Sequence, residues 1–248
     1  MVSEPKFWRE RKGRIIRAIV LDGSYTKREM LETTRLDGSQ IEQAFVELSL
    51  NELVVEKEKD RFLVKSIDLC NEYRSYAKEI KQTLLEWVNE WKKQERINTE
   101  LNHFFLEDKL LDKFSESLIE NAKLEILVAS PYVEQCHVSN LLSSMSQKGI
   151  DTRLLTRSIK LDQYYYEKKV KYLSKLAREG VSVTYDETIH AKLIVVDRRV
   201  AIVSSMNFYA GSSGGASWEA GLVTTEADVV QSIARSILSR IQIASIDQ

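Results

Sequence analysis

Apolar residues near the start of the chain recur at helical spacing. They predict a first helix over residues 7–21, which ends before an Asp-Gly pair. A second helix is expected over residues 26–36, because Thr26 can cap it and Glu29 follows three residues later. Ser39 is expected to cap a third helix, whose apolar face holds Ile41, Ala44, Phe45, Leu48 and Leu53.

Two short strands are expected after these helices. Residues 54–57 and 61–64 are rich in β-forming side chains and are joined by a tight polar turn. Helices followed by a hairpin are typical of a winged helix-turn-helix domain. We therefore expect such a domain, mostly helical, over residues 1–66.

The chain from residue 68 to about residue 120 contains neither Gly nor Pro and predicts continuous helix. Within it we expect a helical linker over residues 67–100. One face of this helix gathers Tyr73, Tyr76, Ile80, Leu84, Trp87, Val88 and Trp91. Two interpretations stay open: the face packs on the protein's own second domain, or it forms a dimer seam.

From Lys123 the pattern changes to short apolar runs that alternate with helices. Strands are expected at residues 124–129, 152–155, 181–185, 192–196 and 201–203, and helices near residues 138–147, 162–178 and 229–243. Continuous apolar strands between helices indicate a sheet that is covered on both faces. The prediction is an α/β domain over residues 101–248.

Composition and charge narrow the classes of protein that fit. Hydrophobic residues make up 43% of the chain and charged residues 29%, which excludes a disordered or low-complexity chain. Cys70 and Cys136 lie far apart without neighbours at metal-ligand spacing, so no metal or cofactor is expected. No apolar run is long enough to span a membrane, and we expect a cytoplasmic protein without membrane contact.

The residues that can carry chemistry follow closely one after another. His190 and Lys192 stand two apart at the start of an expected strand, so their side chains project from the same face. Ser205 and Asn207 have the same spacing after the next strand, and Glu219 follows them. Lys192 can neutralise a phosphoryl group, Ser205 and Asn207 can donate hydrogen bonds to it, and His190 can attack phosphorus. Glu219 can orient the imidazole of His190.

This stretch resembles the HKD signature of the phospholipase D superfamily, H-x-K-x4-D-x6-G-S-x-N. His190, Lys192, Asp197, Ser205 and Asn207 match it in type and spacing, and Ser204 stands where the family usually has Gly. The resemblance extends over residues 101–248 and includes the Gly/Ser-rich loop from Gly211 to Gly215.

The resemblance implies a phospholipase D-like sheet domain with a metal-independent phosphodiesterase activity that proceeds through a phosphohistidine. That family uses two copies of the motif, whereas this chain has one, so the resemblance implies a homodimer in which two His190 side chains converge. Asp197 either supports the site or forms a strand-end turn. His103 and His137 are expected to be structural.

Contact with DNA is expected from the winged helix. Residues 1–28 carry eight Lys and Arg against three Asp and Glu, although the net charge of the whole chain is −1. The third helix lacks Lys and Arg, but polar side chains near its start can address base edges. The alternative is a winged helix that serves protein contact. The candidate DNA-binding residues are Arg11, Lys12, Arg14, Lys27, Arg28, Ser39, Gln40, Gln43, Lys57, Lys59 and Arg61.

A further basic segment runs from Tyr164 to Arg178. It mixes tyrosines with Lys168, Lys169, Lys171 and Lys175. This composition fits a contact with a phosphate backbone, and it also fits a solvated helix face.

The sequence leaves two alternative functions open. The complete set of motif residues favours a phosphodiesterase that acts on nucleic acid. The domain order also resembles the TrmB-type transcription regulators, in which the phospholipase D-like domain senses a ligand and alters DNA affinity. Action on phospholipids is a weaker hypothesis, because no membrane-directed amphipathic helix is evident.

Overall fold

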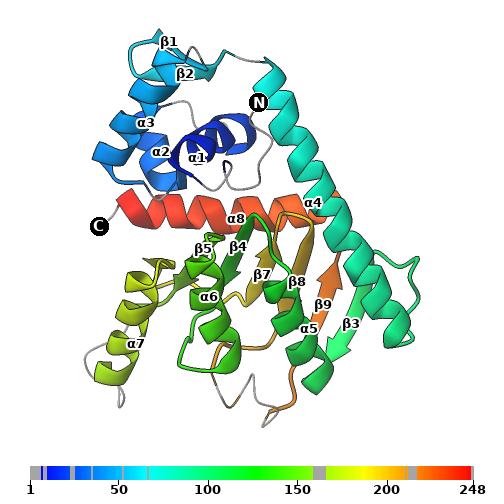
Figure 1. Cartoon of the computed structure of the whole chain (residues 1–248). Helices are drawn as coiled ribbons and strands as arrows, with labels where there is room; N and C mark the ends of the chain where they lie inside the picture. Colours follow the sequence, from blue (N-terminus) through cyan, green and yellow to red (C-terminus); the bar gives the residue numbers. More distant parts are fainter. Residues whose placement is uncertain are drawn as a thin grey trace. The chain divides into compact units, whose positions relative to one another are not determined.

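The chain folds as two compact units, Met1–Glu79 and Ile80–Gln248. Figure 1 draws the computed structural model, which describes residues 7, 10–22, 26–34, 36–51, 53–65, 67–158, 166–209, 211 and 217–246. The helix α4 (Ile67–Gln94) runs across the division between the units. The division into a winged helix domain (1–66), a helical linker (67–100) and an α/β domain (101–248) stays a prediction.

The first unit consists of short helices and a hairpin. In chain order its elements are α1 (Arg11–Arg17), the π-helical turn η2 (Ala18–Asp22), α2 (Lys27–Thr34), α3 (Gly38–Leu50), β1 (Val54–Glu58) and β2 (Arg61–Val64). The two strands are antiparallel. The expected helices and hairpin are therefore present, although α1 begins four residues later than residue 7. The apolar faces meet in a core that includes Ile15, Ile16, Met30, Ile41, Phe45, Leu48 and Phe62.

The start of α2 is capped as the sequence predicts, whereas the start of α3 is not. Thr26 and Glu29 bond reciprocally: Thr26 N donates to Glu29 Oε2 over 2.8 Å, and Glu29 N donates to Thr26 Oγ1 over 3.2 Å. In α3 the cap is Asp37, whose Oδ1 accepts from Gln40 N at 2.8 Å. The Gln40 side chain accepts from Asp37 N at 3.1 Å in return. Ser39 as N-cap was wrong, because the Asp-x-x-Gln pair satisfies both free N–H groups two residues earlier.

A seven-stranded sheet forms the centre of the second unit, in the order β3-β9-β8-β7-β4-β5-β6. The strands β4, β5 and β6 are parallel, and each pair on the β7 side of β4 is antiparallel. The bounds are β3 (His103–Glu107), β4 (Glu125–Ala129), β5 (Asp151–Thr156), β6 (Ser182–Tyr185), β7 (Leu193–Val196), β8 (Val200–Ser204) and β9 (Ala220–Thr224).

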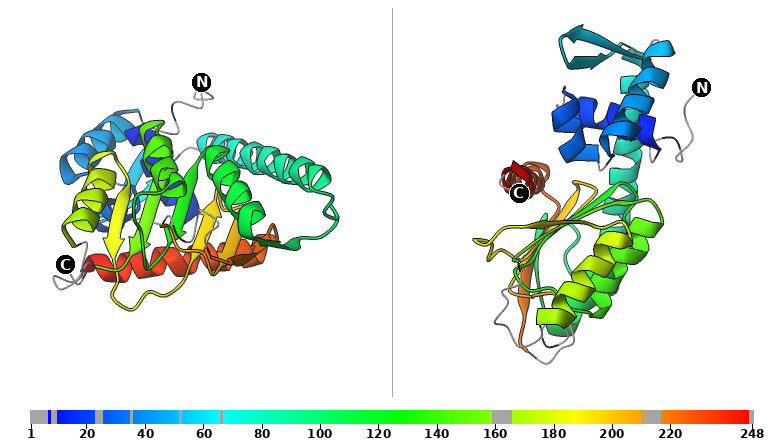
Figure 2. Two further views of the ribbon diagram at one scale, coloured as in Figure 1. Left: turned by 90° about the horizontal axis from the view of Figure 1, so that it is seen from below. Right: turned by 90° about the vertical axis from the view of Figure 1, so that its left-hand side faces the viewer.

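Helices cover both faces of this sheet, as predicted for an α/β domain. One face carries α5 (Asp108–Glu120), α6 (His137–Gln147) and α7 (Tyr166–Arg178), together with the second half of α4. The other face carries α8 (Ala227–Ile246), as Figure 2 shows. Among the described residues, none of the helices combines the length and the apolar content that crossing a bilayer requires.

The continuous helix expected from residue 68 to residue 120 was wrong. The helix α4 ends at Gln94, and Arg96 then takes a left-handed conformation with φ 59°. The segment His103–Glu107 is an edge strand that pairs with β9, and α5 begins directly after it. Its burial alternates along β3, with Phe104 and Leu106 inside. Sequence periodicity could not separate this five-residue strand from helix, because strand pairing depends on the distant β9.

The apolar face of α4 packs, in its second half, on the protein's own second unit. Leu84, Val88 and Trp91 belong to the same buried cluster as Phe104 and Phe114. The ring centroids of Trp91 and Phe114 lie 4.7 Å apart in an edge-to-face arrangement. For these residues the interpretation of packing within the chain holds, and they are not available as a dimer seam.

Replacement of Asp37 tests the corrected cap of α3. Asp37→Ala removes the acceptor for Gln40 N, so the free energy of unfolding should fall by about 1 kcal/mol. The matched control is Ser39→Ala, which alters an exposed side chain in the first turn and should leave stability within about 0.5 kcal/mol of the wild type. Urea unfolding followed by circular dichroism measures both. Equal losses for the two variants would contradict the assignment.

Candidate active site

The predicted site residues gather at one edge of the seven-stranded sheet. The strand directions bring together the start of β7, the end of β8 and the start of β9. His190 and Lys192 precede β7, Ser205 and Asn207 follow β8, and Glu219 precedes β9. Ser204 N donates to Lys192 O over 3.1 Å, and Ser205 N donates to Ala220 O over 2.9 Å. The tertiary fold thus joins residues that are up to 29 positions apart in the sequence.

The imidazole of His190 and the ammonium group of Lys192 lie side by side, as their spacing predicts. Lys192 Nζ is 3.4 Å from His190 Nδ1 and donates to the backbone oxygen of His190 over 2.9 Å. His190 is exposed and Lys192 is half-buried. Burial and the positive charge of Arg157 lower the pKa of Lys192, while the carboxylate of Glu219 acts in the opposite direction. The pair therefore presents a cation next to an accessible ring nitrogen.

Ser205 and Glu219 form the second part of the cluster. The hydroxyl of Ser205 donates to Glu219 Oε2, and it accepts from Ala220 N at 3.1 Å. Glu219 is buried, and Asp108 N donates to its backbone oxygen over 2.8 Å. The carboxylate thus bonds to Ser205 here. The expected bond from Glu219 to the imidazole of His190 stays a prediction, as does the role of the half-buried Asn207.

Asp197 does not lie with the other motif residues. It follows the far end of β7, roughly 16 Å along the strand from Lys192. Its carboxylate is buried and accepts from the backbone N–H groups of Lys123, Leu124 and Glu125 over 2.9, 2.7 and 2.9 Å. Burial raises the pKa of Asp197 to about 6, against the effect of these donors. Asp197 therefore lies apart from His190, Lys192 and Ser205.

The turn that contains Asp197 explains its position. Asp197 and Arg198 have φ of 51° and 49°, and Arg199 N donates to Val196 O over 3.0 Å. Positive φ at both central residues is the geometry of a type I′ hairpin turn. The structure places Asp197 in a strand-end turn, while its role in supporting the site stays a prediction.

Two residues that the sequence analysis missed flank the cluster. Arg157, just beyond β5, donates from Nε to Ile189 O over 2.7 Å, next to His190. Its guanidinium carbon lies 5.9 Å from the ring centroid of Tyr132, which follows β4 and is 40% exposed. No sequence signal marked Arg157, because only the parallel pairing of β4 and β5 brings it to this edge.

Asp112 adds a buried acidic group on the α5 side of the site. Burial raises the pKa of Asp112 to about 6, and the negative charges of Glu116, Glu219 and Asp108 add to this effect. Among the described residues, its Oδ1 atom is buried without a hydrogen-bond partner. The carboxylates on this side of the cluster therefore disfavour one another's charge.

The other two histidines lie apart from the site. His103 begins β3 and pairs with Thr224, at the opposite end of the sheet from His190. His137 begins α6, and its Nε2 lies 3.7 Å from Glu116 Oε2. Within the described ranges no three His, Cys, Asp or Glu side chains are grouped to hold a metal ion. Of the Gly/Ser-rich loop only Gly211 lies inside the described residues.

Several candidate DNA-binding residues of the first unit bond to other side chains of that unit. Lys12 and Lys27 form ion pairs with Glu47 and Glu42 at 3.0 and 2.5 Å. Arg11 Nη1 donates to Gln43 Oε1 over 2.6 Å, and Gln40 belongs to the cap of α3. The exposed candidates in the rest of the unit are Arg28, Ser39, Lys57, Lys59 and Arg61, whereas Arg14 is half-buried.

Half of the chain matches a known protein family, and parts of it resemble solved structures. Residues 116–241 match the family model described as "Cardiolipin synthase, PLD-like domain". No curated protein matches. Among solved structures, the phospholipase D family member Nuc from Salmonella typhimurium is 16% identical over 56% of this chain and 93% of its own, with a TM-score of 0.49.

The chain is also similar to two further solved structures. NucT from Helicobacter pylori is 13% identical over 57% of this chain and 96% of its own, with a TM-score of 0.47. The archaeal chromatin protein TrmBL2 is 12% identical over 97% of both chains, with a TM-score of 0.40.

Replacement of Asp197 tests whether its hydrogen bonds to the start of β4 stabilise the fold. Asp197→Ala leaves three backbone N–H donors near β4 without their acceptor, so the free energy of unfolding should fall by roughly 3 kcal/mol or more. The matched control is Asp228→Ala, because Asp228 is exposed in the first turn of α8 and should contribute less than about 1 kcal/mol. Denaturant unfolding measures both losses. A loss for Asp197→Ala no larger than the control's would overturn the assignment.

Proposed function

The chain belongs to the PLD-like domain family, and from this membership we propose that it is a metal-independent phosphodiesterase that acts on nucleic acid. The reaction proceeds through a phosphohistidine in a site shared by two copies of the chain. One observation carries the proposal: Lys192 Nζ lies 3.4 Å from His190 Nδ1 at an exposed sheet edge. Next to this pair, the hydroxyl of Ser205 is held by the buried Glu219.

The first step is attack on phosphorus by His190. Lys192 lies beside Nδ1 of the imidazole, so Nε2 is the nitrogen directed away from this cation. Nε2 forms the bond to phosphorus from the neutral tautomer, which carries its proton on Nδ1 and leaves the lone pair of Nε2 available. The ammonium group of Lys192 offers a hydrogen bond to a non-bridging oxygen, where negative charge grows in the transition state, and the hydroxyl of Ser205 can do the same once its proton turns from Glu219 to the phosphate. The bond from phosphorus to the leaving oxygen breaks as the bond to Nε2 forms.

The leaving oxygen needs a proton, which the second His190 supplies from its imidazolium form. The same imidazole, now neutral, then takes a proton from water as the water attacks phosphorus and releases His190. One diester and one water give one monoester and one alcohol. Because the other two histidines of this chain lie elsewhere, the acid comes from a second copy of the chain in an isologous homodimer.

The first unit would bring this site to duplex DNA. Lys57 and Lys59 on the hairpin are exposed and have no carboxylate partner in the described part of the chain. Such lysines can release counterions from a phosphate backbone. We therefore propose that the hairpin contributes more to DNA contact than α3, whose polar side chains Gln40 and Gln43 already bond within the unit.

The exposed hairpin lysines also support a second function. In it the chain is a DNA-binding transcription regulator of the TrmB type, and the Lys192 cluster binds an anionic ligand without turning it over. Such a ligand would shift DNA affinity only if it binds the two conformations of the protein with different affinity.

Removal of His190 tests the phosphodiesterase. His190→Ala should lower hydrolysis of bis-p-nitrophenyl phosphate in excess EDTA by roughly 1000-fold or more, because the bond to phosphorus can no longer form. His103→Ala is the matched control and should keep wild-type rates. Undiminished turnover by His190→Ala would rule out the histidine mechanism.

The same assay tests the shared site. Wild-type and His190→Ala chains unfolded together in equal amounts and refolded should form mixed dimers that lack either the nucleophile or the acid. The activity should then be about half of that from the same amount of wild-type chain refolded alone, because mixed dimers are inactive. Activity that stays equal to that of the wild type alone would show that each chain carries a complete site.

Binding measurements test the regulator. Lys57→Gln/Lys59→Gln should lower the slope of log affinity against log salt for duplex DNA by about 1.8, since each lysine contributes about 0.9. A phosphorylated sugar that raises the melting temperature, together with no diester turnover by the wild type, would favour the regulator. No such shift with any phosphorylated sugar, together with turnover, would exclude it.

A further inference from the structure

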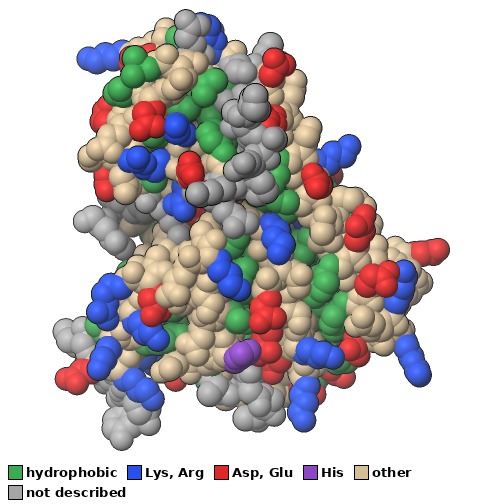
Figure 3. Space-filling view, in the orientation of Figure 1, with side chains coloured by type: hydrophobic (Ala, Val, Ile, Leu, Met, Phe, Trp, Pro, Cys, Tyr) green, Lys and Arg blue, Asp and Glu red, His purple; other side chains and the backbone are tan. Residues whose placement is uncertain are grey.

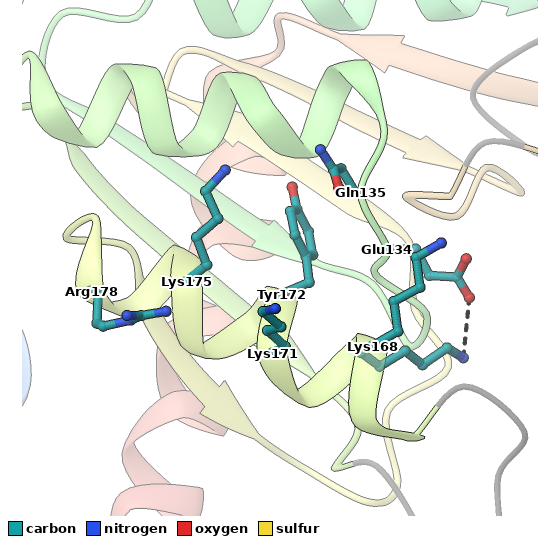
Figure 4. A pocket seen from close by; sticks show the side chains of 8 residues that line it. Glu134, Gln135, Lys168, Lys171, Tyr172, Lys175 and Arg178 are labelled. Atoms are coloured by element: carbon teal, nitrogen blue, oxygen red, sulfur yellow. Dashed lines mark ion pairs between the residues drawn. The ribbon is translucent and has the colours of Figure 1, made fainter.

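A basic pocket lies beside α7, on the same face of the sheet as α5 and α6. It encloses about 560 Å³, and Figure 4 shows Tyr172 and Lys175 extending from α7 toward α6. Its cations come from successive turns of one helix, and Figure 3 shows blue side chains gathered over this helix. They are Lys168, Lys169, Lys171, Lys175 and Arg178, while Glu134 is the acidic residue of the lining.

Part of this positive charge is not balanced by carboxylates of the described residues. Lys169 pairs with Glu134 at 3.3 Å, and Lys175 lies 3.8 Å from Glu179. In contrast, Lys168 and Lys171 are exposed and have no carboxylate partner among the described residues. Tyr172 gives the pocket a rigid wall, because its hydroxyl lies 2.7 Å from Ser139 Oγ and donates to Asn140 Oδ1 over 3.1 Å. The pocket thus combines a rigid aromatic wall with lysines that are unpaired within the described part of the chain.

A line of cations connects this pocket to the candidate active site. Arg157 bonds next to His190 and lies close enough to Lys192 to lower its pKa. The exposed ring of Tyr132 comes next, and its centroid lies 5.9 Å from the Arg157 guanidinium carbon and 5.7 Å from Lys169 Nζ. Lys169 in turn lines the pocket. Cations thus alternate with an aromatic ring from Lys192 to α7.

We propose that this track binds a single-stranded segment of nucleic acid that extends from the active site over Tyr132 into the α7 pocket. A base stacks on Tyr132, and successive phosphates contact Arg157, Lys168 and Lys171. Aromatic rings between cations are the pattern that binds single strands, because their bases are free to stack. The inference rests on the proposed nucleic-acid substrate and assigns its strand state and its path.

The surface of α7 argues against an anionic lipid surface as the occupant. An interfacial helix needs large apolar side chains beside its basic face, so that they enter the acyl boundary. In the described part of α7, Val170 is the large apolar side chain that reaches the surface, at 36% exposure. A phosphate backbone needs no such apolar face.

The test measures binding of a fluorescein-labelled oligothymidylate by anisotropy, in EDTA, at several salt concentrations. All proteins carry His190→Ala, so the strand is not cut. Lys168→Gln/Lys171→Gln should lower the slope of log affinity against log salt by about 1.4, since each phosphate contact in a single strand contributes about 0.7. Tyr132→Ala should weaken binding about 5-fold or more through the lost stacking.

Lys93→Gln/Lys123→Gln is the matched control. It removes the same charge from exposed lysines, at the end of α4 and just before β4, and should leave affinity and slope unchanged. If Lys168→Gln/Lys171→Gln binds the strand as the control does, the track is refuted. Binding to vesicles of anionic phospholipid that depends on Lys168 and Lys171, without binding to the strand, would also refute it.

Hydrolysis of bis-p-nitrophenyl phosphate separates this inference from the proposed function. With His190 present, Lys168→Gln/Lys171→Gln should hydrolyse this small diester at the wild-type rate, because the substrate does not extend to α7. It should cleave the oligonucleotide more slowly than the wild type. If the wild type hydrolyses neither substrate while strand binding still depends on Lys168 and Lys171, the proposed catalysis fails and the binding track stands.

Discussion

The register of β7 between β4 and β8 is the constraint on which the site depends. Asp197 fixes one end of this arrangement, because its buried carboxylate binds the N–H groups at the start of β4 while its own residue forms the turn into β8. The buried ion pair of Arg198 with Glu125 joins the same two places. Since side chains alternate along a strand, a shift of one residue would turn His190 and Lys192 together away from Ser205 and Glu219.

The change in strand direction at β4 then decides which residues share an edge. Because β7 runs antiparallel to β4, its first residues lie beside the last residues of β4, β5 and β8. Tyr132, Arg157, Lys192 and Ser205 come from four separate segments and meet there for this reason. The buried helices α5 and α6 on one face and α8 on the other hold the strands in this order.

Charge in this protein is arranged locally, since the net charge of the chain is only −1. In the first unit, Lys12 and Lys27 are compensated by glutamates of α3. In the second unit the cations of α7 exceed their carboxylate partners, and the acidic residues near Asp112 lie on the α5 side of the site. A polyanion would therefore meet a positive path on one side of His190 and a negative region on the other.

The sequence by itself determined the elements whose signals are local. The cap formed by Thr26 and Glu29, the hairpin of the first unit, the buried strands of the sheet and the proximity of His190 to Lys192 all follow from spacing along the chain. Only the tertiary structure decided that β3 is a strand, that Asp197 stands apart from Lys192, and that Arg157 and Tyr132 reach the site. These features depend on partners distant in sequence, and hydrophobic periodicity carries no information about which strands pair.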